Sequence, residues 1–405
     1  MFYAPVPVIS ESRKSLACVL AGLILCVMPA LSQSADRNQS LLRDAASAIA
    51  AGDALRAETD LQTVLRAAPD NYQALDLLGM LRAQQRREAE AEGIFEQIIA
   101  KHPEFAGAHI HLGLLYIQMG QPDSAVAALQ EGIRLAPDRV DAISALVSIW
   151  REQARTAISS GNTEEALSLL LKARKLSPEN ADVQFEFGMT ALKMNLLPDA
   201  ITAFQQSLKL RPDDANATYG LGRAYMEHSQ YEDARQQFSR YLEARPNDAS
   251  GHYALGMAYA SLERPQDART EFEKSITLAP VQTESYFRLG VLDLNAHDLD
   301  AAAKNFEHVL DRDPKHAGAL AALGRVKYNQ KHYPESAQLL ERAVASDHSL
   351  REAHYYLGLT YARLGRKEDS EQQFQIATRL EHEELEKQKA DLRIVNPNSS
   401  QAQPK

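Results

Sequence analysis

The feature that most constrains this chain is a glycine that recurs at a constant interval along most of its length. Gly79 and Gly113 form a first series, and a second runs through Gly188, Gly222, Gly256, Gly290, Gly324 and Gly358. Prolines keep the same interval ten positions earlier, at Pro69, Pro103, Pro178, Pro212, Pro246, Pro280 and Pro314. A fixed period of this length indicates a stacked repeat array, in which each unit rests on its neighbours.

Each period is predicted to hold two helices. Ala268 and Phe272 lie 12 and 16 residues after Gly256. Most of the other recurrent glycines are followed, at the same two distances, by an alanine and by an aromatic residue or leucine. The apolar positions of 249–282 fall at helical spacing on two successive segments. None of the 17 prolines lies inside a predicted helix, where it would cost about 3 kcal/mol. The small residues allow close approach of the two helices, so we expect an all-α fold.

This pattern resembles the tetratricopeptide repeat (TPR), a helix–turn–helix unit of about 34 residues. The resemblance covers 38–384 as ten repeats: 38–71, 72–105, 106–139, 140–180, 181–214, 215–248, 249–282, 283–316, 317–350 and 351–384. It implies a right-handed superhelical solenoid with a concave groove, lined mainly by the first helix of each repeat.

The fourth repeat, 140–180, departs from this rule because it is longer than the others and lacks the aligned glycine. Its seven extra residues amount to two helical turns, about 10 Å, which preserves the helical phase. We therefore expect a longer first helix that projects beyond the solenoid edge and offers Trp150, the only tryptophan, as a possible ridge contact. A tolerated insertion without a role is the alternative.

The two ends of the chain carry different signals. Arg13 and Lys14 precede an apolar run at 16–28 and a small-residue exit, which predicts a secretory signal peptide at 1–35, cleaved near residues 32–35. An uncleaved membrane anchor is the alternative. Both cysteines lie in this segment, so a periplasmic or secreted location fits the cysteine-free mature chain. At the other end, 385–405 is predicted to be a charged cap followed by a disordered tail.

Catalytic and metal-binding signatures do not stand out. A net charge of -10 argues against nucleic acid as the main partner, and two cysteines exclude a disulfide framework. His109 and His111 point to different sides of a helix, and His252 and His354 recur at the repeat position of His109, which suggests a scaffold role. We expect no enzyme activity, no cofactor and no metal site.

The resemblance places the second, fifth, ninth and twelfth residues of each repeat toward the groove. The residues selected in this way as partner-binding are Phe185, Met189, Tyr219, Arg223, Met226, Tyr253, Met257, Phe287 and Tyr355. Aromatic anchors and adaptable methionines suit a peptide or protein partner. The alternative is that the aromatics pack within their own repeats. The asparagines of chaperone-binding and sugar-transferring relatives are missing from the corresponding positions.

The sequence therefore predicts an interaction scaffold or adaptor for envelope or extracellular assembly, with a protein or peptide partner, no membrane span after signal cleavage and an open oligomeric state. Two other classes remain open: a self-assembling structural protein and an envelope polysaccharide-binding protein.

Overall fold

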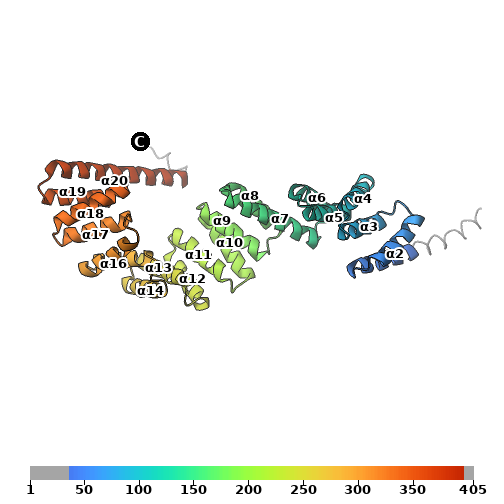
Figure 1. The fold of residues 1–405 in the computed structure, drawn as a ribbon, viewed down its shortest axis with the longest axis horizontal. Coiled ribbons are helices and arrows are strands. Elements are labelled where there is room, and N and C mark those ends of the chain that lie inside the picture. Colours follow the sequence, from blue (N-terminus) through green and yellow to red (C-terminus); the bar gives the residue numbers. More distant parts are fainter. Residues whose placement is uncertain (1–35, 396–405) are drawn as a thin grey trace, which may run out of the picture. The chain divides into compact units, whose positions relative to one another are not determined.

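The computed structural model describes residues 36–395, and these confirm the predicted all-α architecture of paired helices (Figure 1). The predicted signal peptide and the tail at 396–405 lie outside the described residues. The chain divides into two compact units, the first ending at Val183 and the second beginning at Gln184. Each unit is considered by itself below.

In the first unit, residues 36–50 are helical and pair with α2. The helices that follow are α2 (Ala54–Ala67), α3 (Tyr72–Gln84), α4 (Glu88–Lys101), α5 (Ala106–Gln118), α6 (Pro122–Leu135), α7 (Val140–Ser159) and α8 (Thr163–Leu176). The helix α9 (Ala181–Lys193) begins at the last residues of this unit and continues into the second.

The second unit continues the same alternation of helices. Its elements are α10 (Leu197–Leu210), α11 (Ala215–Glu227), α12 (Tyr231–Ala244), α13 (Ala249–Ser261), α14 (Pro265–Leu278), α15 (Glu284–Asn295), α16 (Leu299–Arg312), α17 (Ala317–Asn329), α18 (Tyr333–Ser346), α19 (Arg351–Arg363) and α20 (Lys367–Val395). Within this unit the first and second helices of a repeat pack on each other, as α11 does on α12, and a second helix packs on the next first helix, as α12 does on α13. The helix α20 extends the last repeat well past residue 384.

Local sequence explains where the helices begin. Asp53, Asn71 and Asp298 accept a hydrogen bond from a backbone N–H of the first helical turn, which satisfies a group that otherwise lacks a partner. Proline occupies the first turn of α6, α10, α14 and α18, where its missing N–H costs nothing.

The turn between the two helices of a repeat needs one residue with a left-handed backbone. Glycine supplies it at Gly52, Gly120, Gly161 and Gly365, with φ between 71° and 85°. The other six repeats place a non-glycine residue at the same position, with φ between 57° and 67°: Arg86, Asn195, Ser229, Glu263, His297 and Lys331. The packing of the helix pair therefore imposes a conformation that disfavours a side chain.

We expect Glu263→Gly to raise the free energy of unfolding by about 0.5–1 kcal/mol, because glycine relieves the left-handed strain at the cost of a more flexible unfolded chain. Urea denaturation followed by circular dichroism measures the change. The matched control is Glu273→Gly, an exposed position inside α14, which should lose about 1 kcal/mol. Equal losses in both variants would contradict this account of the turn.

The core repeats one contact between the recurrent glycine and the aromatic ring of the second helix. A Cβ atom built on Gly256 would lie 2.6 Å from the Phe272 ring, and the same clash holds between Gly222 and Phe238. The largest fully buried side chains include Phe95, Phe204, Phe238, Phe272 and Phe306. The glycine thus makes room for a ring that lies directly over the backbone of its partner helix.

The last two repeats each carry a buried serine whose hydroxyl is satisfied in the same way. Ser336 and Ser370 stand where other repeats have a buried alanine. Their hydroxyls donate to the carbonyl oxygens of Gly324 and Gly358, each at 2.8 Å. A serine fits this position because the recurrent glycine leaves its carbonyl within reach.

Candidate functional site

The predicted partner-binding residues all lie on first helices of the second unit. Some of these helices are neighbours: α11 contacts α13, and α17 contacts both α15 and α19. We call the surface made by the nine residues named above the first-helix face: Phe185, Met189, Tyr219, Arg223, Met226, Tyr253, Met257, Phe287 and Tyr355. The residues occupy corresponding repeat positions on the first helices α9, α11, α13, α15 and α19.

The aromatic side chains of the first-helix face pack against buried phenylalanines of the core. Each ring lies 5.5–6.0 Å from the ring of a second-helix phenylalanine in its own repeat: Phe185 with Phe204, Tyr219 with Phe238, Tyr253 with Phe272, Phe287 with Phe306 and Tyr355 with Phe374. Tyr219 also lies 5.0 Å from the Tyr241 ring, and burial raises the pKa of its hydroxyl. These side chains therefore serve the scaffold while one edge remains accessible.

Exposure separates the members of the face. Met189 is 38% exposed and Tyr355 is 46% exposed, whereas the other apolar members of the face are half-buried. Met226 and Met257 are half-buried and pack against the clusters around Phe238 and Phe272. Met189 and Tyr355 are thus the members with the most apolar surface free for a partner.

Two arginines interrupt the apolar surface in different ways. Arg325 donates from Nη1 to Glu352 Oε1 at 2.8 Å, and its guanidinium lies 5.3 Å from the Tyr356 ring centroid. Arg223 lies 3.6 Å from Glu227, with both side chains almost half exposed. Because exposed ion pairs of this kind contribute little, Arg223 can exchange Glu227 for a carboxylate on a partner.

The histidines at the recurring position connect each first helix to the loop before it. His109, His252 and His354 each bring Nε2 within 3.2 Å of the backbone carbonyl six residues earlier, on Pro103, Pro246 and His348. The scaffold role predicted for them is confirmed by these contacts. Among residues 36–395 no group of three or more His, Cys, Asp or Glu residues is placed to hold a metal ion.

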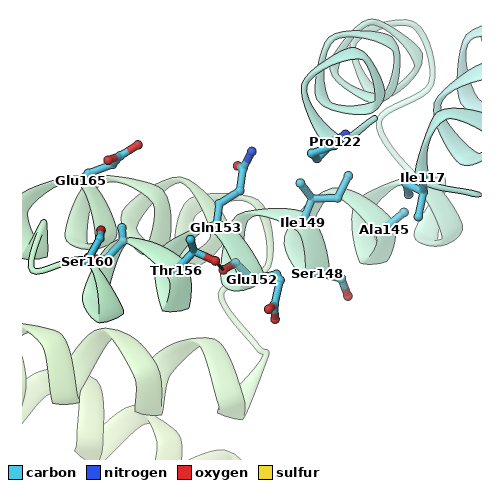
Figure 2. A pocket seen from close by; sticks show the side chains of 11 residues that line it. Ile117, Pro122, Ala145, Ser148, Ile149, Glu152, Gln153, Thr156, Ser160 and Glu165 are labelled. Carbon is cyan, nitrogen blue, oxygen red and sulfur yellow. Dashed lines mark hydrogen bonds between the residues drawn. The ribbon is translucent and has the colours of Figure 1, made fainter. Parts of the chain in front are cut away.

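The first unit contains a pocket of about 820 Å³ that was not among the sites expected from the sequence (Figure 2). One stripe of α7 forms most of its wall, and Ile117, Pro122 and Glu165 complete it from α5, α6 and α8. The only sequence signal for this pocket is the longer fourth repeat. The length of α7, 20 residues against 13 for α5, agrees with the predicted extension of the first helix.

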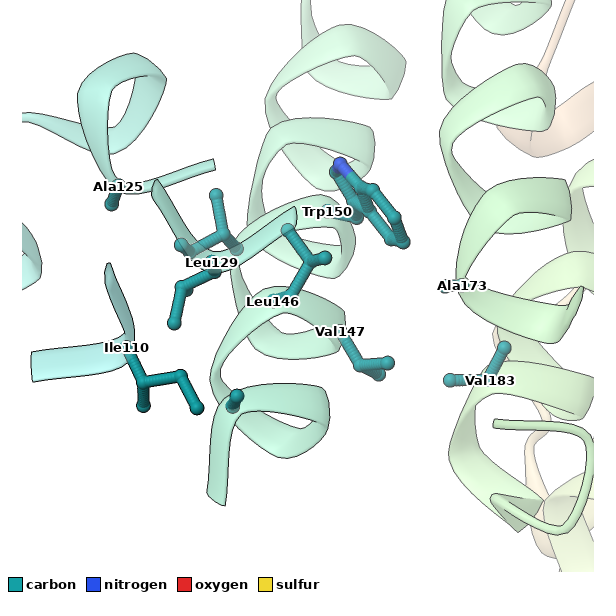
Figure 3. Close-up of a cluster of buried hydrophobic side chains, with 10 residues drawn as sticks. Ile110, Ala125, Leu129, Leu146, Val147, Trp150, Ala173 and Val183 are labelled. Carbon is teal, nitrogen blue, oxygen red and sulfur yellow. The ribbon is translucent and has the colours of Figure 1, made fainter. Parts of the chain in front are cut away.

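The proposed role of Trp150 as an exposed ridge contact is wrong. Its side chain is only 6% exposed and belongs to the cluster of Leu146, Val147 and Leu129 (Figure 3). The helix α7 buries Trp150 because the indole lies on the same side as Leu146 and Val147, three to four residues earlier. Ile149 belongs to the same buried cluster and also lines the pocket, so the pocket adjoins the core side of α7.

The recurring pairs of helices and the packing of each repeat on the next define an all-α tetratricopeptide-repeat protein. The family model for the cilia and flagella-associated protein 70 C-terminal domain matches residues 27–285, and a second tetratricopeptide-repeat model matches residues 293–359. The first match spans more than half of the chain, which therefore belongs to the family of the cilia and flagella-associated protein 70 C-terminal domain.

Individual relatives are more distant. The chain is 26% identical over 166 residues to the cellulose synthase 2 operon protein C of Komagataeibacter xylinus, a match that spans 41% of this chain and 12% of that protein. A MamA fragment from Desulfovibrio magneticus RS-1 is 25% identical over 42% of this chain and 96% of its own, with a TM-score of 0.40. YrrB, described as a TPR protein with an unusual peptide-binding site, is 26% identical over 45% of this chain and 95% of its own, with a TM-score of 0.39.

Within residues 36–395, no helix is both long and apolar enough to cross a membrane.

Proposed function

We propose that this protein is a non-enzymatic interaction scaffold that binds a protein or peptide partner on the first-helix face. The observation that carries the proposal is the surface exposure of Met189 and Tyr355 on helices whose neighbours present half-buried aromatic and methionine side chains. Rings fixed by the phenylalanines beneath them lose little freedom on binding, which makes them efficient anchors. Arg223 adds a cation that can fix the direction of a bound segment.

The setting we propose is the periplasm or the cell exterior. The support is the pattern of basic flank, apolar run and small-residue exit in 1–35. The mass of the intact protein isolated from its own cells decides this point. Loss of about the first 32–35 residues supports export, whereas a chain that keeps them and remains inside the cell contradicts it.

The test of the scaffold function uses two charge substitutions at the exposed members of the face. We expect Met189→Glu with Tyr355→Glu to weaken capture of the partner from an extract of the native cells by about tenfold or more, because each buries a charge in an apolar contact. Quantitative mass spectrometry of co-purified proteins measures the loss.

The matched control carries Leu196→Glu with Leu278→Glu, at apolar side chains that are 37% and 40% exposed but lie off the face. It should retain the partner, and circular dichroism should show intact helices in both variants. If the same proteins co-purify equally with the wild type and with both double variants, the first-helix face is not the binding site. Loss of capture to added polysaccharide, or concentration-dependent sedimentation of the pure protein, would favour the polymer-binding or self-assembling class instead.

A further inference from the structure

The pocket along α7 lies where the fourth repeat departs from its neighbours. Residues of α7 line it at helical spacing, followed by the cap residue Ser160: Ala145, Ser148, Ile149, Glu152, Gln153, Thr156 and Ala157. Residues three and four apart share one face of a helix, so these side chains form one continuous stripe. The pocket is therefore an open helix face with a wall at its side (Figure 2).

Along the pocket, α7 extends beyond a neighbouring helix. The helix α5 ends at Gln118, which corresponds in the repeat to Glu152 of α7. The residues of α7 after Glu152 therefore continue past the end of α5. On this stretch Thr156 is exposed, whereas Ala154 and Ala157 stay buried. Gln153 reaches α6, where its Nε2 donates to Asp123 Oδ1.

The walls combine an apolar floor with an acidic rim. Ile117 is 40% exposed and supplies the accessible apolar surface, while Ile149 and Ala157 form a buried floor with 9% and 5% exposure. Glu152 and Glu165 supply the carboxylates, and no lysine or arginine is among the lining residues. Asp123 stands close by, since its Oδ1 accepts from Gln153 Nε2 at 3.4 Å.

The rim carboxylates keep capacity for further hydrogen bonds. Glu165 Oε2 accepts from Asn162 Nδ2 at 2.7 Å, which leaves other acceptor positions of the carboxylate open. Glu152 pairs with Arg155 at 3.2 Å, but both side chains are more than half exposed. Such a pair contributes little and exchanges readily for a better-placed cation.

We propose that this pocket is a second docking site, which binds a short amphipathic helical segment of a partner protein that carries leucine-sized side chains flanked by lysine or arginine. The apolar side chains cover Ile117 and Ile149, and the flanking cations pair with Glu152 and Glu165. A second copy of this chain fits less well, because its net charge of -10 opposes approach to an acidic rim. The proposal is independent of the first-helix face.

The test uses the full-length chain and a short fluorescein-labelled peptide of leucine, alanine and lysine, about four helical turns long, with its leucines at helical spacing. A second peptide has glutamate in place of every lysine. We expect the lysine peptide to bind, as measured by fluorescence anisotropy, and the glutamate peptide not to bind. Glu152→Lys with Glu165→Lys should weaken binding of the lysine peptide by about tenfold or more.

The matched control is Glu131→Lys with Glu164→Lys. Glu131 pairs with Arg134 three residues later, as Glu152 does with Arg155, and Glu164 precedes Glu165 on α8, but neither lines the pocket. The control should bind the lysine peptide like the wild type. Hydrogen exchange should slow at residues 152–160 of the wild type when the peptide is bound.

Four results would overturn the proposal. They are failure of the wild type to bind the lysine peptide, equal weakening in the two double variants, protection from exchange away from α7, and tight binding of the glutamate peptide. A further outcome concerns self-association: the wild type sediments as a dimer, and the double variant Glu152→Lys with Glu165→Lys sediments as a monomer. That outcome would assign the pocket to a second copy of this chain and reject the basic partner.

Discussion

Phe272→Ala is expected to lower the free energy of unfolding by about 3–5 kcal/mol. The Phe272 side chain is 1% exposed, its ring lies over the backbone of Gly256, and the Tyr253 ring is 5.9 Å away. Truncation removes this contact in the centre of the repeat and leaves a cavity that the neighbouring helices cannot close. Urea denaturation followed by circular dichroism measures the loss.

Phe272→Leu is the matched control, because the array already uses leucine at this position. Leu129 and Leu340 lie over Gly113 and Gly324, where a Cβ atom would come within 2.6 Å of the leucine side chain. We therefore expect the leucine variant to lose less than half as much stability as the alanine variant. A loss below about 1 kcal/mol for Phe272→Ala would show that the glycine–ring contact does not hold the repeat together.

Arg269→Met is expected to cost about 3 kcal/mol, because it leaves a buried carboxylate without its cation. Asp293 is 2% exposed, and its carboxylate accepts hydrogen bonds from Arg269 and from Asn305 Nδ2. With the arginine removed, only Asn305 remains to satisfy it. The free energy of unfolding from urea titration measures the cost.

Two further variants test the cause. Arg235 occupies the same repeat position as Arg269 but lies beside the neutral Tyr259 and pairs with the exposed Glu232, so Arg235→Met should cost less than about 1 kcal/mol. Arg269→Met with Asp293→Leu should recover most of the stability, because apolar replacement of a buried ion pair is often neutral. A double variant no more stable than Arg269→Met would contradict the unpaired-carboxylate explanation.

These polar contacts between repeats recur at one constant separation along the chain, which the sequence analysis did not recognise. Arg82 Nη2 donates to Glu58 Oε1 at 2.7 Å, and the Tyr116 hydroxyl donates to Glu92 Oε1 at 3.0 Å. Arg269 with Asp293 has the same spacing. The residue types differ from pair to pair, so no single residue type marks the position, whereas the glycine and proline positions are marked by one type each.

The fold could be predicted because two physical constraints repeat along the array. Only glycine fits beneath a ring such as that of Phe272, and proline is tolerated only at helix starts and ends. Period and helix number follow from these residues. The residue Glu263 does not itself mark the left-handed turn, because helix packing imposes this conformation against the preference of the side chain. The glycines at the same repeat position, such as Gly365, are the only sequence signal for it.

The candidate site was predictable in position but not in exposure. Repeat register places Tyr219 and Tyr355 on the same face, yet Tyr219 is also held by Tyr241 while Tyr355 stays largely exposed. The burial of Trp150 and the pocket beside it depend on which side of α7 meets α5 and α6. Which side of α7 packs on α5 and α6 depends on the three-dimensional packing around the insertion. The sequence shows only that the fourth repeat is longer than the others.

The measurement that tests the central claim most directly is site-specific photocrosslinking in the native cells. A photoreactive phenylalanine analogue is placed at Met189 or Tyr355 on the first-helix face, and at the exposed Glu273 or Lys304 on second helices as controls. The account predicts that one partner protein crosslinks from both face positions and from neither control. Crosslinks to that partner from the second-helix positions alone, or from all four positions equally, would contradict it.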